Sequence, residues 1–356
     1  MTRTALIDQP KPLRDEDRFD VEAVDAWLKA RVEGLDGSPE VAQFSRGASN
    51  LTYRLRYANR DLILRRPPSG TKAKSAHNMV REYAVQKALK PVYPCVPEML
   101  ALCTDEAVIG SEFYVMERLE GIILRANLPE GLELDADRAR RLSEAAIDRL
   151  IDLHQVDVQE AGLEELGKGA GYNRRQIAGW SERFRRARTW NVLPGRYVMD
   201  WLAERVPDEV AICVIHGDYR FDNLVLDPDD PLRIMAVLDW ELATLGDPLM
   251  DLGNSMAYWV QVDDEKYFKG FRRQPTHLPG MMTRAEVVAY YCARTGFRPD
   301  HWAFYEVYGL FRLAVIAQQI YYRYHHRQTR NPQFRHFWIA VNYLLWRCRR
   351  IIRQAG

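Results

Sequence analysis

Residues 214–252, VIHGDYRFDNLVLDPDDPLRIMAVLDWELATLGDPLMDL, decide the fold of this 356-residue chain. Two short apolar runs lie at 224–226 and 234–238, and the residues between them are rich in Asp and Pro. Asp-Pro and Asp-Asp-Pro are strong turn formers, because proline fixes its own backbone angle and aspartate bonds to the nearby main chain. The stretch therefore predicts a β-hairpin that follows a polar loop at 216–223.

Three oxygen-bearing side chains, Asp218, Asn223 and Asp239, surround this hairpin. Since a hairpin returns the chain, we expect Asp239 to lie close to Asn223, with Asp218 in the loop just before them. Mg²⁺ takes oxygen ligands and often uses one or two carboxylates together with phosphate oxygens. A further carboxylate that the metal does not use can orient a substrate hydroxyl or accept its proton. Any one of the three alone is equally compatible with a turn or capping role.

The order and spacing of the three residues resemble the catalytic apparatus of protein kinases, in which an Asp precedes a metal-binding Asn by five positions and a second metal-binding Asp follows a hairpin. Here Asp218, Asn223 and Asp239 occupy those positions. The local letters His-Gly-Asp and Asp-Trp-Glu, with Gly-Asp-Pro-x-x-Asp at 246–251, resemble the aminoglycoside phosphotransferase and choline kinase-like family. The resemblance covers about residues 40–260. It implies in-line phosphoryl transfer, with Asp218 as the catalytic residue and Asn223 and Asp239 as ligands of Mg²⁺.

Other polar residues of this stretch are interpreted as structural. Asp247 and Asp251 are spaced i, i+4 at the start of a predicted helix, where carboxylates cap free N–H groups and complement the helix dipole. We expect them to brace the catalytic loop, and we interpret His216 as a structural loop residue.

The rest of the chain divides into a sheet-rich part and a helix-rich part. A short helix is expected at 21–32, strand-like runs and one helical pattern at 76–89 occupy the region from about 40 to 120, and helical periodicity dominates from about 136 onward. The predicted fold class is α+β, a bilobal protein-kinase-like fold with a small antiparallel-sheet lobe and a larger, mainly helical lobe. The expected division is an irregular arm at 1–19, a nucleotide-binding lobe at 20–120, and a lobe at 121–356 that contains the catalytic loop 214–251 and a helical acceptor-binding region. Within the helix-rich part, helices are expected at 138–154, 173–190, 196–206, 283–295, 301–324 and 334–353.

A nucleotide site requires a loop that covers the phosphates. The run FSRGASN at 44–50 lies between two strand-like segments, and its small residues allow the backbone N–H groups, Gly47, and Ser49 or Asn50 to approach phosphates. It has a single glycine, so a plain hairpin turn is an equally good interpretation.

The phosphate-binding cation is expected in the next strand, DLILRR at 61–66. The resemblance places Arg65 there, with Arg66 as the second choice, where protein kinases have a lysine. Arginine binds phosphate bidentately and stays charged, so the role survives this change. Glu82, the acidic residue of the helix at 76–89, is placed to pair with that arginine. The alternatives are a solvated edge-strand arginine and a surface glutamate.

The strand YVMERL at 114–119 occupies the place of the kinase segment that leads to the hinge between lobes. Main-chain groups near Glu117 and Leu119 are then expected to bind adenine. The implied cofactors are ATP and Mg²⁺, and whether GTP replaces ATP stays open.

The bulk composition limits the partners. The formal net charge is +1, so no overall field draws the chain to nucleic acid or to a membrane. The five cysteines have no metal-binding or C-x-x-C spacing, and the first 19 residues lack the apolar core of a signal peptide. These features favour a cytoplasmic protein that acts on a small molecule.

The charge of the C-terminal region and a second family resemblance indicate the chemical class of the acceptor. Residues 244–356 hold 16 Lys and Arg against 8 Asp and Glu, together with many aromatic residues, which favours an anionic acceptor with an apolar part. FSRGASNLTYRL, LRRPP, MVREYAVQKAL and LDWELATLGDPLMDLG resemble the kinase domain associated with acyl-CoA dehydrogenases, which implies a CoA thioester such as 4-hydroxyacyl-CoA. The arginines of this region are Arg323, Arg327, Arg330, Arg335, Arg347, Arg349, Arg350 and Arg353.

Other interpretations remain open from the sequence. The basic helices are equally typical of a solvated surface or of a homodimer face. The acceptor can instead be an aminoglycoside, choline or another small molecule. A pseudokinase-like nucleotide-binding module is the alternative outside the enzymes, because the anchor strand lacks lysine and the loop at 44–50 is poor in glycine.

Overall fold

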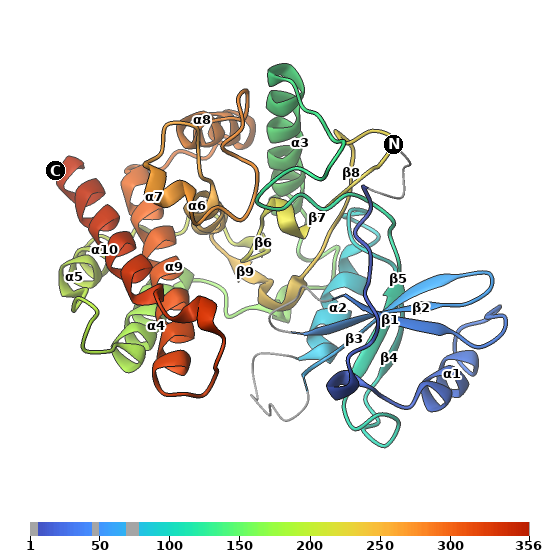
Figure 1. Cartoon of the computed structure of the whole chain (residues 1–356). Coiled ribbons are helices and arrows are strands. Elements are labelled where there is room, and N and C mark those ends of the chain that lie inside the picture. The colour runs from blue at the N-terminus through green and yellow to red at the C-terminus, as the bar shows by residue number, and fades with distance from the viewer. Residues whose placement is uncertain (1–5, 45–49, 69–77, 356) are drawn as a thin grey trace. The chain divides into compact units, whose positions relative to one another are not determined.

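The computed structural model describes residues 6–44, 50–68 and 78–355. Gly47 and Ser49, two of the expected nucleotide contacts, lie outside the described residues. The chain divides into two compact units (Figure 1). The sheet unit comprises Met1–Glu133, Val156–Leu163 and Phe221–Ala243, and the helical unit comprises Leu134–Gln155, Glu164–Arg220 and Thr244–Gly356.

The sheet unit is built on a five-stranded antiparallel sheet with strand order β1-β2-β3-β5-β4. Its strands are β1 (Glu40–Phe44), β2 (Leu51–Arg56), β3 (Asp61–Arg66), β4 (Met99–Cys103) and β5 (Phe113–Glu117). The unit also holds the helices α1 (Val21–Lys29) and α2 (Met79–Leu89), and the hairpin of β7 (Leu224–Leu226) and β8 (Ile234–Val237).

Strand alternation gives the sheet two different faces. Leu62 and Leu64 of β3 join the buried cluster that contains α1, whereas Ile63 joins the cluster that contains Met79 of α2. Successive side chains of a strand point to opposite faces, so Arg65 lies on the α2 face. This alternation decides which basic side chain reaches the site.

The helical unit consists mainly of helices, with one short two-stranded ladder of β6 (Cys213–Ile215) and β9 (Thr244–Gly246). Its helices are α3 (Ala136–His154), α4 (Tyr172–Ala187), α5 (Arg196–Glu204), α6 (Pro248–Tyr258), α7 (Lys266–Lys269), α8 (Arg284–Thr295), α9 (Trp302–His325) and α10 (Phe337–Gln354). The long helix α9 packs against α6 and α10 (Figure 1). A Cβ atom built on Gly309 of α9 would lie 2.1 Å from the carbonyl oxygen of Gly253 in α6, so these glycines permit the close crossing.

The fold-class prediction is confirmed: an antiparallel sheet near the N-terminus is followed by a mainly helical region. The expected helices end within about three residues of the observed ones, and the hairpin at 224–238 forms. Over the described part of the chain, no helix has the length and apolar character needed to cross a membrane.

Candidate active site

The sheet unit contains a cavity of about 170 Å³. Its lining combines apolar and polar side chains. The apolar lining includes Phe44, Ile63, Met116, Leu119, Val225 and Leu238, and the polar lining includes Asn50, Arg65, Glu117, Asn223 and Asp239. We call this cavity the nucleotide pocket, after the use proposed below.

Arg65 connects two carboxylates at this pocket. Its guanidinium lies 2.9 Å from Glu82 of α2 and 2.9 Å from Asp239. The hydroxyl of Tyr114 also donates to Glu82 at 2.9 Å. Burial raises the pKa of Glu82, and the charge of Arg65 opposes this shift. The result is a buried cation held in place by one carboxylate on each side.

Arg66 serves a different purpose. It lies on the α1 face of the sheet, where its guanidinium donates to the carbonyl oxygen of Asp17 at 2.7 Å and to the hydroxyl of Tyr53. Arg66 does not line the nucleotide pocket. Of the two candidates that the sequence leaves open, the geometry therefore favours Arg65 as the phosphate-binding cation.

The hairpin places Asp239 next to Asn223. Leu224 pairs with Val237, and the main-chain N–H of Leu238 donates to the carbonyl oxygen of Asn223 at 2.8 Å. Asp239 has a left-handed backbone with φ of 69°, which is unfavourable for residues other than glycine and is most often found at turns and functional sites. Both side chains line the nucleotide pocket.

Three other expected nucleotide contacts also line this pocket. Asn50 is buried and its side-chain amide lies 3.4 Å from Glu241. The carboxylate of Glu117 accepts a bond from the main-chain N–H of Glu98 at 2.7 Å, so this side chain is committed away from adenine. The main-chain N–H of Glu117 donates to the carbonyl oxygen of Glu98 at 3.0 Å, so the main-chain contacts expected for adenine are the carbonyl oxygen of Glu117 and the main chain of Leu119.

Asp218 belongs to the helical unit, in the loop that follows β6. Its main-chain N–H donates to His216 Nδ1 at 3.2 Å, and its carboxylate lies 2.9 Å from the guanidinium of Arg220. Arg220 in turn stacks over the ring of Tyr258, 4.5 Å from its centroid. These contacts fix the orientation of the Asp218 carboxylate.

The loop that carries Asp218 is held by a buried network. Asp251 accepts bonds from the main-chain N–H groups of His216 and Gly217 at 2.9 and 2.8 Å. His154 contributes a further contact to Asp251 at 3.2 Å. Burial acts to raise the pKa of Asp251, but the bond and charge of His154, the charge of His216 and the main-chain bond from His216 lower it below the usual value.

Sequence reasoning did not identify two residues of this loop support. His154 ends α3, and its bond to Asp251 spans 97 residues, so no local pattern announces it. Arg312 of α9 is buried and donates to the carbonyl oxygen of Gly217 at 2.7 Å. A signal for Arg312 does exist, because it is the one charged residue in the apolar run 307–316.

The donor set in the nucleotide pocket fits a hard cation bound to phosphate. Asn223 offers an amide oxygen and Asp239 a carboxylate, and Arg65 adds a positive charge beside them. Among the described residues there is no group of three or more His, Cys, Asp or Glu side chains suited to a metal ion. Mg²⁺ is commonly held by one or two carboxylates and completed by substrate phosphates, so two protein ligands are sufficient.

Comparison with known proteins also indicates a phosphotransferase. The model of the phosphotransferase enzyme family matches residues 40–287. Acyl-CoA dehydrogenase family member 10 of Mus musculus is 36% identical over 315 residues, which cover 88% of this chain and 29% of the mouse protein. The chain thus spans less than a third of that relative's length.

Solved structures with the same fold are described as aminoglycoside phosphotransferases. A crystal structure from Ralstonia eutropha, provisionally described as an aminoglycoside phosphotransferase, is 34% identical with a TM-score of 0.79, covering 95% of this chain and 100% of that one. A mutant of aminoglycoside phosphotransferase APH(4)-Ia, in ternary complex with AMP-PNP and hygromycin B, shares the fold at 14% identity and a TM-score of 0.57, covering 94% and 99% of the two chains. This chain therefore belongs to the phosphotransferase enzyme family and is a kinase-type phosphotransferase.

Proposed function

We propose that this chain transfers the γ-phosphoryl group of ATP to a hydroxyl group of a small metabolite, with a hydroxyacyl-CoA such as 4-hydroxyacyl-CoA as the best candidate. The observation that supports ATP as the phosphoryl donor is the cluster of Arg65, Glu82 and Asp239 at one largely apolar pocket. An apolar slot suits adenine, and a cation beside a carboxylate suits metal-bound phosphate.

Each residue of the nucleotide pocket has a proposed role. Asn223 and Asp239 hold Mg²⁺, which when bound neutralises phosphate charge and orients the γ-phosphoryl group. Arg65 binds phosphate oxygens, and Glu82 keeps its guanidinium in position through the contact of 2.9 Å. Main-chain groups at Glu117 and Leu119 bind adenine. Gly47, Ser49 and Asn50 are proposed as contacts of the phosphates.

Asp218 is the proposed catalytic residue. It orients the acceptor hydroxyl and takes its proton as the acceptor oxygen forms a bond to the γ-phosphorus. The bond between the γ-phosphorus and the β,γ-bridging oxygen breaks, ADP departs with the bonding electrons, and Asp218 later releases the proton to solvent. Because this chemistry depends mainly on placement and electrostatics, the contacts that fix the loop of Asp218 are part of the mechanism.

The helical unit contains an apolar cavity that supports an acyl acceptor. The cavity measures about 90 Å³ and adjoins Tyr258, the residue over which Arg220 stacks. The Asp218 carboxylate contacts Arg220, and Arg220 contacts Tyr258 in the cavity wall. Two successive contacts therefore connect Asp218 to this cavity. An engineered apolar cavity of about 150 Å³ binds benzene, so this one suits a hydrocarbon segment of roughly four carbons. The other lining residues are Ala257, Val260, Phe268, Phe271, Arg273, Leu313, Ala317, Phe337, Ala340 and Leu344.

The charge of this cavity also favours an anionic acceptor over a polycation. Arg273 is the one charged residue in its lining, and an aminoglycoside would meet no carboxylate there. A protein that binds a polycationic acceptor needs acidic side chains in its acceptor-binding site. The acyl assignment also agrees with the name of the mouse relative, an acyl-CoA dehydrogenase family member.

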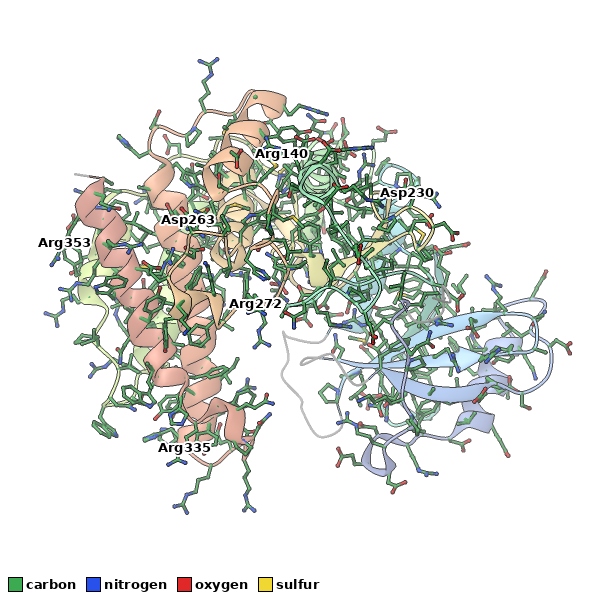
Figure 2. The ribbon with its side chains drawn as sticks, turned by 45° about the horizontal axis from the view of Figure 1, so that its top comes forward. Arg140, Asp230, Asp263, Arg272, Arg335 and Arg353 are labelled. Carbon is green, nitrogen blue, oxygen red and sulfur yellow. The ribbon has the colours of Figure 1, made fainter. Side chains whose placement is uncertain are left out.

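The arginines near the C-terminus do not form one anion-binding surface. Arg347 is buried and lies 3.2 Å from Asp264 and 2.8 Å from Glu265, and Arg350 also pairs with Glu265. Figure 2 shows Arg335 and Arg353, both exposed, at well-separated points of the helical unit. We therefore base the acyl-CoA proposal on the cavity and not on these helices.

The second candidate is an aminoglycoside kinase. The observation that favours it is the Ralstonia eutropha structure, which matches nearly the whole chain at 34% identity and is provisionally described in that way. The two candidates differ in the sign of the acceptor's charge, so a small panel of acceptors separates them.

Turnover assays with Mg-ATP test the proposal. The panel contains 3- and 4-hydroxyacyl-CoA of several chain lengths, kanamycin, hygromycin B and choline, and ADP release is measured together with the mass of the phosphorylated product. We expect phosphorylation of a hydroxyacyl-CoA, and a loss of roughly 10²- to 10⁴-fold in kcat in Asp218→Ala. Asp239→Ala should also abolish turnover.

The same assays define what would contradict the proposal. Exposed Asp230→Ala serves as the matched control, and thermal unfolding verifies that each variant folds. Normal turnover in both Asp218→Ala and Asp239→Ala would mean that the site is wrong. Turnover of an aminoglycoside alone would retain the site and replace the acceptor.

A further inference from the structure

The N-terminal arm, residues 6–19, is fixed to the sheet unit. Lys11 and Gln43 exchange two main-chain hydrogen bonds of 2.8 Å, so the arm runs beside β1, the edge strand of the sheet (Figure 1). Further along, the carbonyl oxygen of Asp17 accepts bonds from Arg66 and Tyr53 at 2.7 and 2.9 Å. These two attachments hold the arm in one path along the sheet.

The early part of this arm lines the nucleotide pocket. Ile7 and Asp8 both belong to the pocket lining. The main-chain N–H of Asp8 donates to the carbonyl oxygen of Gly121 at 3.4 Å, and its carboxylate lies 2.9 Å from the guanidinium of Arg125. About 31% of the Asp8 side chain and 27% of the Arg125 side chain are exposed, so the pair borders the pocket without being sealed off.

The position of Asp8 indicates which part of a nucleotide it would meet. Gly121 and Arg125 follow Glu117 and Leu119, the residues proposed to bind adenine, by only a few positions. Arg65 and Asp239 mark the phosphate end of the same pocket. The sugar of a nucleotide lies between its base and its phosphates, so a pocket residue attached just beyond the adenine segment is placed to meet the sugar.

The chemistry of the pair also suits a sugar. Oδ2 of Asp8 faces Arg125, and among the described residues no hydrogen bond is made to Oδ1. A carboxylate oxygen is an acceptor only, and the two neighbouring hydroxyls of ribose are donors. The guanidinium of Arg125 binds the other carboxylate oxygen and fixes the plane of the carboxylate.

We infer that Asp8, held by Arg125, forms the ribose subsite of the nucleotide pocket and accepts hydrogen bonds from the 2′- and 3′-hydroxyls. The inference rests on the proposed function, since it concerns the same pocket. It makes the arm a functional part of the nucleotide site: a residue from the start of the chain selects a ribonucleotide over a deoxyribonucleotide. Asp8 is then a binding residue and Arg125 a positioning residue.

The test compares the binding of ATP, 2′-deoxyATP and 3′-deoxyATP by isothermal titration calorimetry, with Mg²⁺ present and no acceptor. The experiment uses the full chain in four forms, which are the wild type and the variants Asp8→Asn, Asp8→Ala and Arg125→Ala. A hydrogen bond to a charged group is worth roughly a factor of ten to a hundred in affinity. We expect wild type to prefer ATP over a deoxy analogue by about tenfold or more. We expect Asp8→Ala to lose that preference, and Asp8→Asn to reduce it, through weaker binding of ATP, because the amide oxygen of asparagine still accepts a hydrogen bond but carries no charge.

The controls separate a ribose contact from a general effect on the fold. Arg125→Ala should reduce the preference by a smaller factor, because the carboxylate remains. Asp15→Ala is the matched control on the same arm: Asp15 pairs with Arg18 at the surface, does not line the pocket, and should leave the preference unchanged. Thermal unfolding of each variant verifies that the sheet unit is intact.

The outcomes are distinguishable. If wild type binds ATP but does not prefer it over either deoxy analogue, or if Asp8→Ala weakens all three nucleotides equally, the ribose subsite is overturned and the proposed function stands. If wild type binds no adenine nucleotide, the proposed function and this inference both fall. Loss of the preference in Asp8→Ala, with Asp15→Ala unaffected, supports the inference.

Discussion

The two units hold their proposed catalytic parts by different kinds of interaction. In the sheet unit, Arg65 forms ion pairs with Glu82 and Asp239 beside a pocket. In the helical unit, Asp251 is fully buried and binds the main-chain N–H groups of the loop that carries Asp218. One arrangement is ionic and borders a cavity, and the other is a closed hydrogen-bond network.

This difference between ion pairs and a hydrogen-bond network follows from the role proposed for each unit. In the proposed function phosphate enters beside Arg65, and the guanidinium would exchange its contact with Asp239 for contacts with the ligand. The loop of Asp218 has no such exchange to make, and its geometry has to be the same before and after binding. We therefore expect variants of the sheet unit to change nucleotide use and variants of the helical unit to change stability and kcat.

The largest expected effect comes from Asp251→Ala in the helical unit. The change leaves two buried main-chain N–H groups without their acceptor and removes one of the two side-chain partners of His154, so we expect a loss of about 3–5 kcal/mol in unfolding free energy. Chemical unfolding measures this loss. Asp137→Ala on the exposed face of α3 is the control, with 81% of its side chain exposed. A change below about 1 kcal/mol in Asp251→Ala would contradict the role of the network.

The next effect is expected from Arg65→Ala in the sheet unit. Removing the cation beside the proposed phosphate site should lower kcat/KM for ATP by roughly 10²- to 10³-fold. Arg65→Lys should recover part of this loss, because it restores the charge but not the two-pronged geometry. Steady-state kinetics with varied ATP measure the effect, and exposed Arg56→Ala on β2 is the control. An unchanged kcat/KM in Arg65→Ala would remove Arg65 from the site.

These two regions also differ in how far they can be predicted from sequence. Asp218, Asn223 and Asp239 lie within 22 residues and are ordered by one hairpin, so their spacing is visible in the letters. Choosing between Arg65 and Arg66 requires knowing which sheet face α1 covers, which is a tertiary fact. His154 reaches Asp251 only through the packing of α3, and no local pattern carries that information.

A smaller effect is expected from Glu82→Gln. Glutamine keeps an acceptor for the hydroxyl of Tyr114 but loses the charge that holds Arg65, so the guanidinium becomes less well placed. We expect kcat/KM for ATP to fall by about tenfold, with little change in the KM of the acceptor. Kinetics with each substrate varied in turn separate the two, and exposed Glu22→Gln on α1 is the control. An equal rise in both KM values would indicate general damage instead of misplacement of Arg65.

The smallest effect concerns pH and again separates the two units. Because the folded pKa of Asp251 lies below its unfolded value of about 3.9, its ionised form stabilises the native state above that pH. The contribution is lost as pH falls through the folded pKa, so the unfolding free energy should decline below about pH 4. Glu286, whose pKa is lowered to about 2 by its bonds to Thr283, adds to the same decline, so the informative quantity is the difference between wild type and Asp251→Asn. That difference should shrink as the pH is lowered, because the asparagine cannot titrate. If unfolding curves from about pH 5 to pH 3 show a constant difference, the pKa of Asp251 is the same in the folded and unfolded states, and the network does not lower it as argued.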